Sequence, residues 1–176
     1  MNHDHYDDTY IASILGDVKS VAMVGASAKV NRPSYFVMKY LGAKGYSLAP
    51  VNPGLVGEDI LGHKVYGTLA ECSAPIEMVD IFRNSEAALD VTREAIRLKD
   101  KLGIKVIWMQ LTVRNDIAAA EAETAGLLVV MNRCPKIEYG RLSGEIGWAG
   151  ISTGVISSKR PLLGAGVQNQ RLATKR

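Results

Sequence analysis

The segment from Ser20 to Tyr35, SVAMVGASAKVNRPSY, constrains the fold more than any other part of the chain. It opens with the apolar run Val21–Val24, which stops at Gly25, and a small polar loop then leads into a helical pattern at Pro33. An apolar run of this length, followed by a glycine and a helix, is typical of a buried strand in an α/β domain. We therefore expect a strand, a tight turn and a helix here.

The loop of this segment is a candidate phosphate site. The first turn of a helix presents unpaired backbone N–H groups and a partial positive charge, which together favour an anion. Lys29 and Arg32 add positive charge, and Ser27 and Ser34 add hydroxyl groups. Because only Gly25 remains of the three glycines in the dinucleotide motif G-x-G-x-x-G, a purely structural turn is the alternative.

Length and composition indicate one domain. The chain has 176 residues and is 47% hydrophobic, which is enough for one well-buried core. The net charge of +3 arises from the basic tail after Glu145, so a general nucleic-acid surface is not expected. Two cysteines suit a reducing compartment, no apolar run approaches the roughly 20 residues of a membrane span, and the acidic start is unlike a signal peptide. We expect a cytoplasmic protein.

Strand and helix patterns alternate along the rest of the chain. A helix is expected over 8–18, before the first strand, and Ser85 is expected to cap the helix after the third strand. The alternation predicts a Rossmann-like α/β fold, a doubly wound parallel sheet of about five strands flanked by helices. The later strands are expected at 46–51, 77–82, 105–110 and 127–131, with a short edge strand at 63–66 and helices at 34–43, 86–102 and 115–125.

The chemistry-bearing residues follow the carboxyl ends of these strands. Arg83, after the third core strand, is a second phosphate candidate, with a surface ion pair as the alternative. An NAD-binding domain carries an acidic residue at the end of its second strand. Asn52 stands there instead, which counts against NAD and less against NADP, whose 2′-phosphate an arginine can bind.

The strand ends together match a known family. The matching stretches are VGAS and NRPSY, PVNPG, VDIFRNSE, VIWMQL and VVMNRCPKIEYGRL. With them, the chain resembles the single-domain CoA-binding proteins, which are similar to the N-terminal domain of the succinyl-CoA synthetase alpha subunit, over about residues 7–142. The resemblance implies binding of the nucleotide end of coenzyme A, with Ser27 to Val30 and Phe82 to Asn84 lining the ligand.

Two departures from the synthetase matter. Leu55 stands where the synthetase carries a lysine that approaches the CoA phosphates, so Lys29, Arg32 and Arg83 are the cations that could replace it. The domain that carries the phosphohistidine is missing from this chain, and ligase activity is therefore not expected of it.

We thus predict a CoA-binding site without a metal at the carboxyl ends of the strands. Cys134 is a candidate thiol, because the neighbouring Arg133 would favour the thiolate and allow a mixed disulfide with CoA; an inert, partly buried cysteine is the alternative. The candidate binding residues are Gly25, Ala26, Ser27, Ala28, Lys29, Val30, Arg32, Pro33, Ser34, Asn52, Pro53, Phe82, Arg83, Asn84, Gln110 and Asn132.

The resulting hypothesis is a non-catalytic module that binds CoA or an acyl-CoA, since no paired acid and base or nucleophile set accompanies the strand ends. The alternatives are a CoA-linked acyl or thiol transferase, or enzyme subunit, that uses Cys134, and an NADP-dependent oxidoreductase. We expect residues 1–142 to form the domain and 143–176 a glycine-rich extension that could contact a second copy or a partner protein, through Trp148 for example.

The chain start is expected to be loose and solvated. Its alternative role is to bind copper or nickel through Met1-Asn2-His3. His63 is expected to be an exposed polar residue rather than a ligand.

Overall fold

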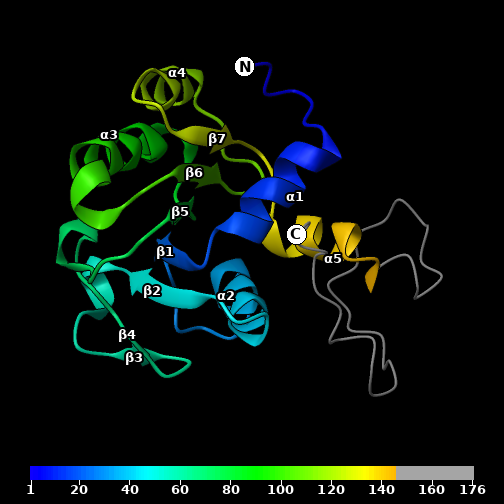
Figure 1. Cartoon of the computed structure of the whole chain (residues 1–176). Helices are drawn as coiled ribbons and strands as arrows, with labels where there is room; N and C mark the ends of the chain where they lie inside the picture. Colours follow the sequence, from blue (N-terminus) through cyan, green and yellow to red (C-terminus); the bar gives the residue numbers. More distant parts are fainter. Residues whose placement is uncertain (146–176) are drawn as a thin grey trace.

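The computed structural model describes residues 1–145, which fold around a parallel five-stranded sheet (Figure 1). Its strands lie in the order β2-β1-β5-β6-β7, and each pairs with its neighbour in parallel. The predicted Rossmann-like α/β fold is therefore confirmed. The strands are β1 (Ser20–Val24), β2 (Ser47–Val51), β5 (Met78–Ile81), β6 (Val106–Met109) and β7 (Leu128–Val130).

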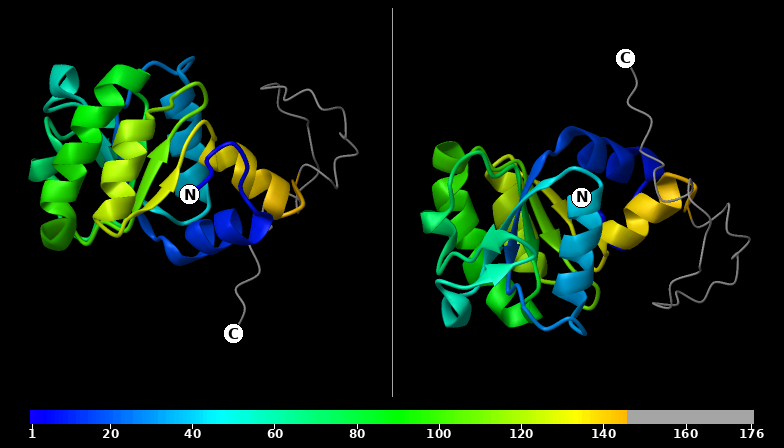
Figure 2. Two further views of the ribbon diagram at one scale, coloured as in Figure 1. Left: turned by 90° about the horizontal axis from the view of Figure 1, so that it is seen from above. Right: turned by 90° about the horizontal axis from the view of Figure 1, so that it is seen from below.

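Helices cover both faces of the sheet (Figure 2). One core joins β-sheet residues such as Met23 and Trp108 to the helices α1, α2 and α5, and the other joins residues such as Ile107 to α3 and α4. Alternate strand residues point to opposite faces, so both cores draw on the same short apolar strands. The helices are α1 (Asp8–Asp17), α2 (Pro33–Ala43), α3 (Ser85–Leu102), α4 (Asp116–Thr124) and α5 (Pro135–Leu142).

The chain between β2 and β5 forms a small hairpin at the edge of the sheet. The edge strand predicted at 63–66 is present only in part. Its first half, β4 (His63–Lys64), pairs antiparallel with β3 (Asp59–Ile60). At its end, Tyr66 makes a single parallel bridge to Val51. Tyr66 thus occupies the place of a rudimentary strand outside β2. Short 3₁₀ turns flank the hairpin at Pro53–Leu55 and Leu69–Glu71.

With Tyr66 included, the strand order follows the Rossmann sequence, in which the first strand lies in the middle of the sheet. The connection after β1 leads to one side, toward β2 and Tyr66, whereas β5, β6 and β7 fill the other side. The direction of winding therefore reverses between β1 and β5. In open α/β sheets, ligands bind in the crevice at the carboxyl ends of the strands beside this reversal.

One predicted helix cap is wrong. Asn84, not Ser85, is the N-cap of α3: its side-chain oxygen accepts a hydrogen bond from the backbone N–H of Ala87 at 2.9 Å. Ser85 is the first helical residue instead. Asn and Ser are equally good caps in sequence, so the pattern alone could not separate two adjacent candidates.

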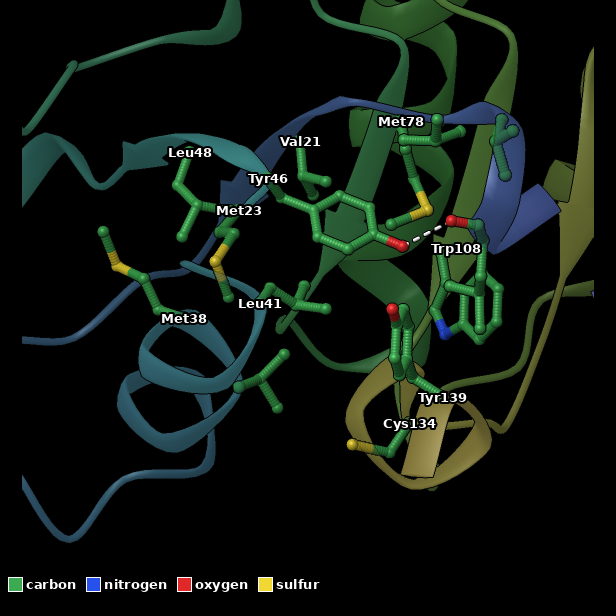
Figure 3. Packing of buried hydrophobic residues seen from close by; sticks show 14 of the residues in the cluster. Val21, Met23, Met38, Leu41, Tyr46, Leu48, Met78, Trp108, Cys134 and Tyr139 are labelled. Carbon is green, nitrogen blue, oxygen red and sulfur yellow. Dashed lines mark hydrogen bonds between the residues drawn. The ribbon is translucent and has the colours of Figure 1, made fainter. Parts of the chain in front are cut away.

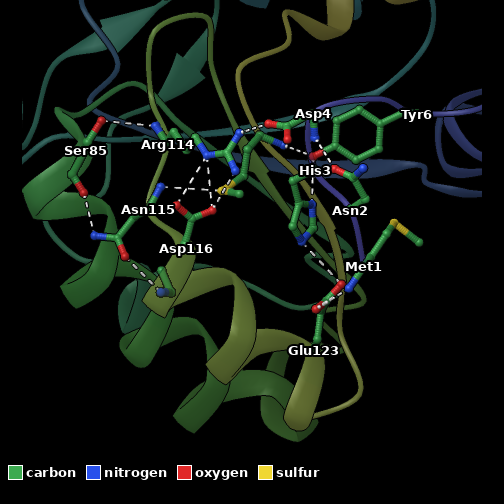
Figure 4. A network of polar contacts seen from close by, with 12 residues as sticks. Met1, Asn2, His3, Asp4, Tyr6, Ser85, Arg114, Asn115, Asp116 and Glu123 are labelled. Carbon is green, nitrogen blue, oxygen red and sulfur yellow. Dashed lines mark hydrogen bonds and ion pairs between the residues drawn. The ribbon is translucent and has the colours of Figure 1, made fainter.

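The chain start is packed rather than loose (Figure 4), which corrects a second expectation. The terminal ammonium of Met1 pairs with Glu123 at 3.1 Å, the buried His3 contacts the hydroxyl of Tyr6, and Asp4 pairs with Arg114. These partners occupy the amine and the imidazole that a copper site would need. Within residues 1–145, no group of three or more metal-binding side chains comes together.

A sheet edge explains this packing. The outer backbone groups of the edge strand β7 and its end would lack hydrogen-bond partners, which is costly for an edge that is partly buried. The Tyr10 hydroxyl lies 3.2 Å from both the N–H and the carbonyl of Val129, and the Tyr6 hydroxyl accepts from the N–H of Met131 at 2.7 Å. Two tyrosines thus replace the missing neighbour strand.

The described chain ends against α2. The carboxylate of Glu145 accepts a hydrogen bond from Tyr40 at 2.7 Å and pairs with Lys44. The glycine-rich stretch around Trp148 lies outside the described residues, and its separate role stays a prediction. No helix in residues 1–145 has both the length and the apolar character needed to cross a bilayer.

Candidate functional site

The site begins at Gly25, where β1 ends beside β5. The N–H of Gly25 donates to the carbonyl of Val51 at 2.9 Å, and the N–H of Phe82 donates to the carbonyl of Val24 at 2.8 Å. Gly25 has a φ of +90°, and a β-carbon there would lie 2.9 Å from the carbonyl oxygen of Phe82. Only glycine fits both the left-handed backbone and this close approach. Gly25 therefore lets the loop turn directly over the end of β5.

The loop leads to the start of α2, which has no side-chain cap. Pro33 occupies the first helical turn, and the N-cap residue Arg32 has an extended backbone whose side chain makes no capping hydrogen bond. The first turn contains no acidic residue. The positive end of this helix is therefore not neutralised by side chains of its own first turn, as expected for an anion-binding end.

Three cations surround this end of the sheet. Lys29, Arg32 and Arg83 are exposed, and none of them makes an ion pair with any carboxylate in residues 1–145. The Cδ of Arg83 lies 3.1 Å from the β-carbon position of Gly25, so the Arg83 side chain crosses from β5 toward the β1–α2 loop. By contrast, Arg93, Arg114 and Arg141 are all paired with acids.

Asn52 ties the end of β2 to the same loop. Its Nδ2 donates to the carbonyl of Ala26 at 2.7 Å, and its Oδ1 accepts from the N–H of Gly54 at 2.9 Å. The residue that stands in the acidic position of NAD-binding domains thus holds the β1–α2 loop. Direct contact of Asn52 with a ligand stays a prediction.

The loops after β5, β6 and β7 are also tied together. The Oδ1 of Asn132 accepts from the N–H of Thr112 at 2.8 Å, and the Nδ2 of Asn115 donates to the carbonyl of Ser85 at 2.9 Å. Thr112 and Asn132 have φ values of 69° and 52°, which non-glycine residues rarely adopt. Strained backbone of this kind is often found at functional sites.

Sequence reasoning missed Asp80, a fully buried carboxyl in the middle of β5. Both of its oxygens accept from Nε2 of Gln110, at 3.0 and 3.1 Å. Burial raises the pKa of Asp80 to about 8, against which the Gln110 hydrogen bond acts. The signal was available, because an aspartate within the apolar run MVDI is out of place in a buried strand.

The surroundings of Cys134 favour the alternative of an inert, buried cysteine. It lies in the core beside Tyr139 (Figure 3) and caps the start of α5. Burial raises the pKa of its thiol to about 11, although the backbone N–H groups of Ile137 and Lys136 act in the opposite direction. The guanidinium of Arg133 stacks over the ring of Tyr6 and lies 3.8 Å from Glu138 instead of activating the thiol.

The structure brings most of the remaining predicted residues to one edge. The β1–α2 loop carries Ala26, which is buried, and the half-buried or exposed Ser27, Ala28 and Val30; Ser34 is buried in the first turn of α2. Pro53 is exposed after β2, and Phe82 packs partly against the core. His63 lies on the β3–β4 hairpin and is half-buried rather than exposed.

A cavity of about 240 Å³ lies elsewhere, between the N-terminal segment, α1 and α5. Its arginines, Arg133 and Arg141, lie beside the carboxylate of Glu138, and Arg141 also pairs with Asp8. This charge-balanced cavity is a poorer anion site than the carboxyl edge, where the cations have no carboxylate partner within residues 1–145.

The fold and the carboxyl edge define the class: a Rossmann-like domain whose winding reversal carries a helix start without a side-chain cap and cations that have no carboxylate partner in the described residues. Residues 19–140 match the model of the CoA binding domain family, CoA_binding_2. The chain therefore belongs to this family of CoA-binding domains, as the sequence resemblance indicated.

Known proteins of similar sequence and structure agree. The uncharacterized protein YneT of Bacillus subtilis (strain 168) is 33% identical over 129 residues, 73% of this chain and 91% of that protein. A hypothetical protein from Pyrococcus horikoshii OT3 has a solved structure with 38% identity and a TM-score of 0.73, over 81% of this chain and 96% of that one. A Thermus thermophilus structure, cell-free ID.343, has 29% identity and a TM-score of 0.72, over 77% and 98%.

The close approach at Gly25 can be tested by adding one methyl group. Gly25→Ala should lower the free energy of unfolding by about 1–3 kcal/mol, because it combines a left-handed backbone with a contact against a carbonyl. Gly16→Ala is the matched control, since a β-carbon at Gly16 in α1 would meet nothing within 4 Å. In urea unfolding, the free energy of unfolding of Gly16→Ala should equal or exceed that of the wild type. Equal free energies of unfolding for Gly25→Ala and Gly16→Ala would contradict this account.

The burial of Asp80 predicts a pH dependence of stability. The unfolded carboxyl ionises near pH 4, whereas the folded one ionises near its raised pKa of about 8. The native state therefore holds more protons between these values, and this contribution to stability falls as the pH rises through them. Asp80→Asn removes the dependence, so the variant should gain stability relative to the wild type between about pH 5 and pH 8. If the difference in urea midpoint between Asp80→Asn and the wild type were the same at every pH from about 5 to 8, the pKa of Asp80 would not be raised.

Proposed function

We propose that this protein binds coenzyme A or an acyl-CoA through its nucleotide end, as a binding or regulatory module without chemistry of its own. The observation that carries the proposal is a group of cations at the winding reversal that have no carboxylate partner in residues 1–145: Lys29, Arg32 and Arg83, beside the start of α2, which has no side-chain cap. Phosphates are the ligand groups that use both a helix N-terminus and mobile cations. Membership of the CoA-binding domain family supports coenzyme A as the phosphorylated ligand.

The residues present fit this ligand chemically. The 3′-phosphate and the diphosphate of CoA offer several charges for three cations, two of which are guanidinium groups capable of bidentate hydrogen bonds. The half-buried Phe82 and the exposed Val30 supply apolar surface next to them, of the kind that an adenine ring requires. These assignments to parts of the ligand are our proposal.

A transferase that works through Cys134 is less well supported. A nucleophilic thiol must reach its thiolate form near neutral pH, and burial instead raises the pKa of Cys134 to about 11. Its side chain belongs to the core. The buried surroundings of Cys134 therefore favour the binding proposal over this alternative.

Calorimetric titration with CoA tests the proposal. Arg32→Ala should weaken CoA binding about tenfold or more, because a charge-assisted hydrogen bond to phosphate is lost. Arg97→Ala removes the same charge from an exposed position on α3 and should leave the affinity unchanged.

The ligands in this titration separate the alternatives. CoA should bind more tightly than 3′-dephospho-CoA, and NADP should bind weakly or not at all. Heat from NADP with none from any CoA species would contradict the proposal and favour an oxidoreductase.

A further inference from the structure

Gln110 is the predicted site residue with an unused polar atom. Its Nε2 is held by the buried Asp80, while its Oε1 has no hydrogen-bond partner in residues 1–145. Oε1 is not sealed inside the core either, because the Nε2 of His3 is the one fully buried side-chain polar atom without a partner in the described chain. Gln110 as a whole is 6% exposed, so its amide oxygen has only a small opening to solvent, at the carboxyl edge.

The neighbouring amides differ from Gln110. Asn52 uses both its oxygen and its nitrogen on backbone groups, and the side-chain oxygens of Asn84 and Asn132 each accept from a backbone N–H. Among these candidate residues, Gln110 alone keeps its amide oxygen available in the part of the chain that the structure describes. A ligand that extends from the phosphate loop toward β6 would find an acceptor, whereas one that extends toward β2 would find Asn52 already occupied.

Asp80 gives that acceptor a fixed direction. It lies between Met23 and Trp108 on one face of the sheet, so its carboxyl has apolar neighbours on both adjacent strands. The Cys134 thiol is the titratable group that acts on it from α5, and it stays neutral well above pH 7. Ionised Asp80 can only accept hydrogen bonds, so it holds Nε2, and turning the amide would cost this buried hydrogen bond.

On the basis of the proposed function, we propose that Gln110, oriented by Asp80, binds the pantetheine arm of CoA. Its side-chain oxygen would accept a hydrogen bond from one of the amide N–H groups of the pantetheine. The geometry supports this reach: β6 lies two strands from β1, which is about 10 Å at the usual strand spacing. The pantetheine arm is long enough to cover that distance and carries two amides. Asp80 would then be a positioning residue, since it acts through Gln110 and does not touch the ligand.

The test compares CoA with adenosine 3′,5′-bisphosphate, which lacks the pantetheine arm. Gln110→Met keeps the size of the side chain but removes the amide. It should lower CoA affinity about fivefold to tenfold, the usual effect of one hydrogen bond, and leave the affinity for the bisphosphate unchanged. Asp80→Leu should have the same selective effect, whereas Asp80→Asn keeps an acceptor for Nε2 and should retain most of the CoA affinity.

Each outcome has a distinct meaning. A Gln110→Met protein that keeps the wild-type preference for CoA over the bisphosphate overturns the role of Gln110 but leaves the proposed function intact. An equal loss for both ligands also overturns it, because a general disturbance of the site would act on both. Failure of the wild type to bind either ligand overturns the proposed function itself. If Asp80→Leu does not fold, Gln110→Met by itself tests the role of Gln110. Gln110 follows the end of β6 rather than lying inside the strand, so its substitution should disturb the sheet less.

Discussion

The close packing of Gly25 against Phe82 is the constraint on which the site depends. Only at this glycine can the backbone leave β1 over the carbonyl of the adjacent strand. As a result, the side chain of Arg83 crosses from β5 toward the loop that leads to the start of α2. The remaining parts of the fold hold β1 and β5 side by side in the middle of the sheet, with helices on both faces.

A second layer of hydrogen bonds keeps this region in place. Asn52 fixes the β1–α2 loop, Asn84 caps α3, and Asn132 joins the loops after β6 and β7. The N-terminal segment adds an outer support, because Tyr6 contacts the end of β7 and Asp4 pairs with Arg114 after β6. Some polar residues that follow the strand ends in sequence therefore hydrogen-bond to the backbone and hold the loops in place. Only the others keep polar groups with which a ligand could interact.

The sequence predicted the fold well because the fold depends on local patterns. Short apolar runs, helical spacing and Gly25 located the sheet, its strands and the carboxyl edge. The sequence could not predict which partners the polar side chains would choose, because these partners are distant along the chain: Asp80 and Gln110 are 30 residues apart, and Tyr6 and Met131 are 125 apart. The same limit applies at Cys134: the neighbouring arginine in sequence favours the thiolate, whereas burial in three dimensions raises the pKa of the thiol.

The central claim is that CoA occupies the carboxyl edge between β1 and β5. The most direct measurement is a titration of isotopically labelled protein with CoA, followed by backbone amide NMR shifts. We predict the largest shifts at residues 25–34 and 82–84, with little change in α4 or in the cavity between α1 and α5. Shifts centred on that cavity, with an unchanged β1–α2 loop, would contradict the account.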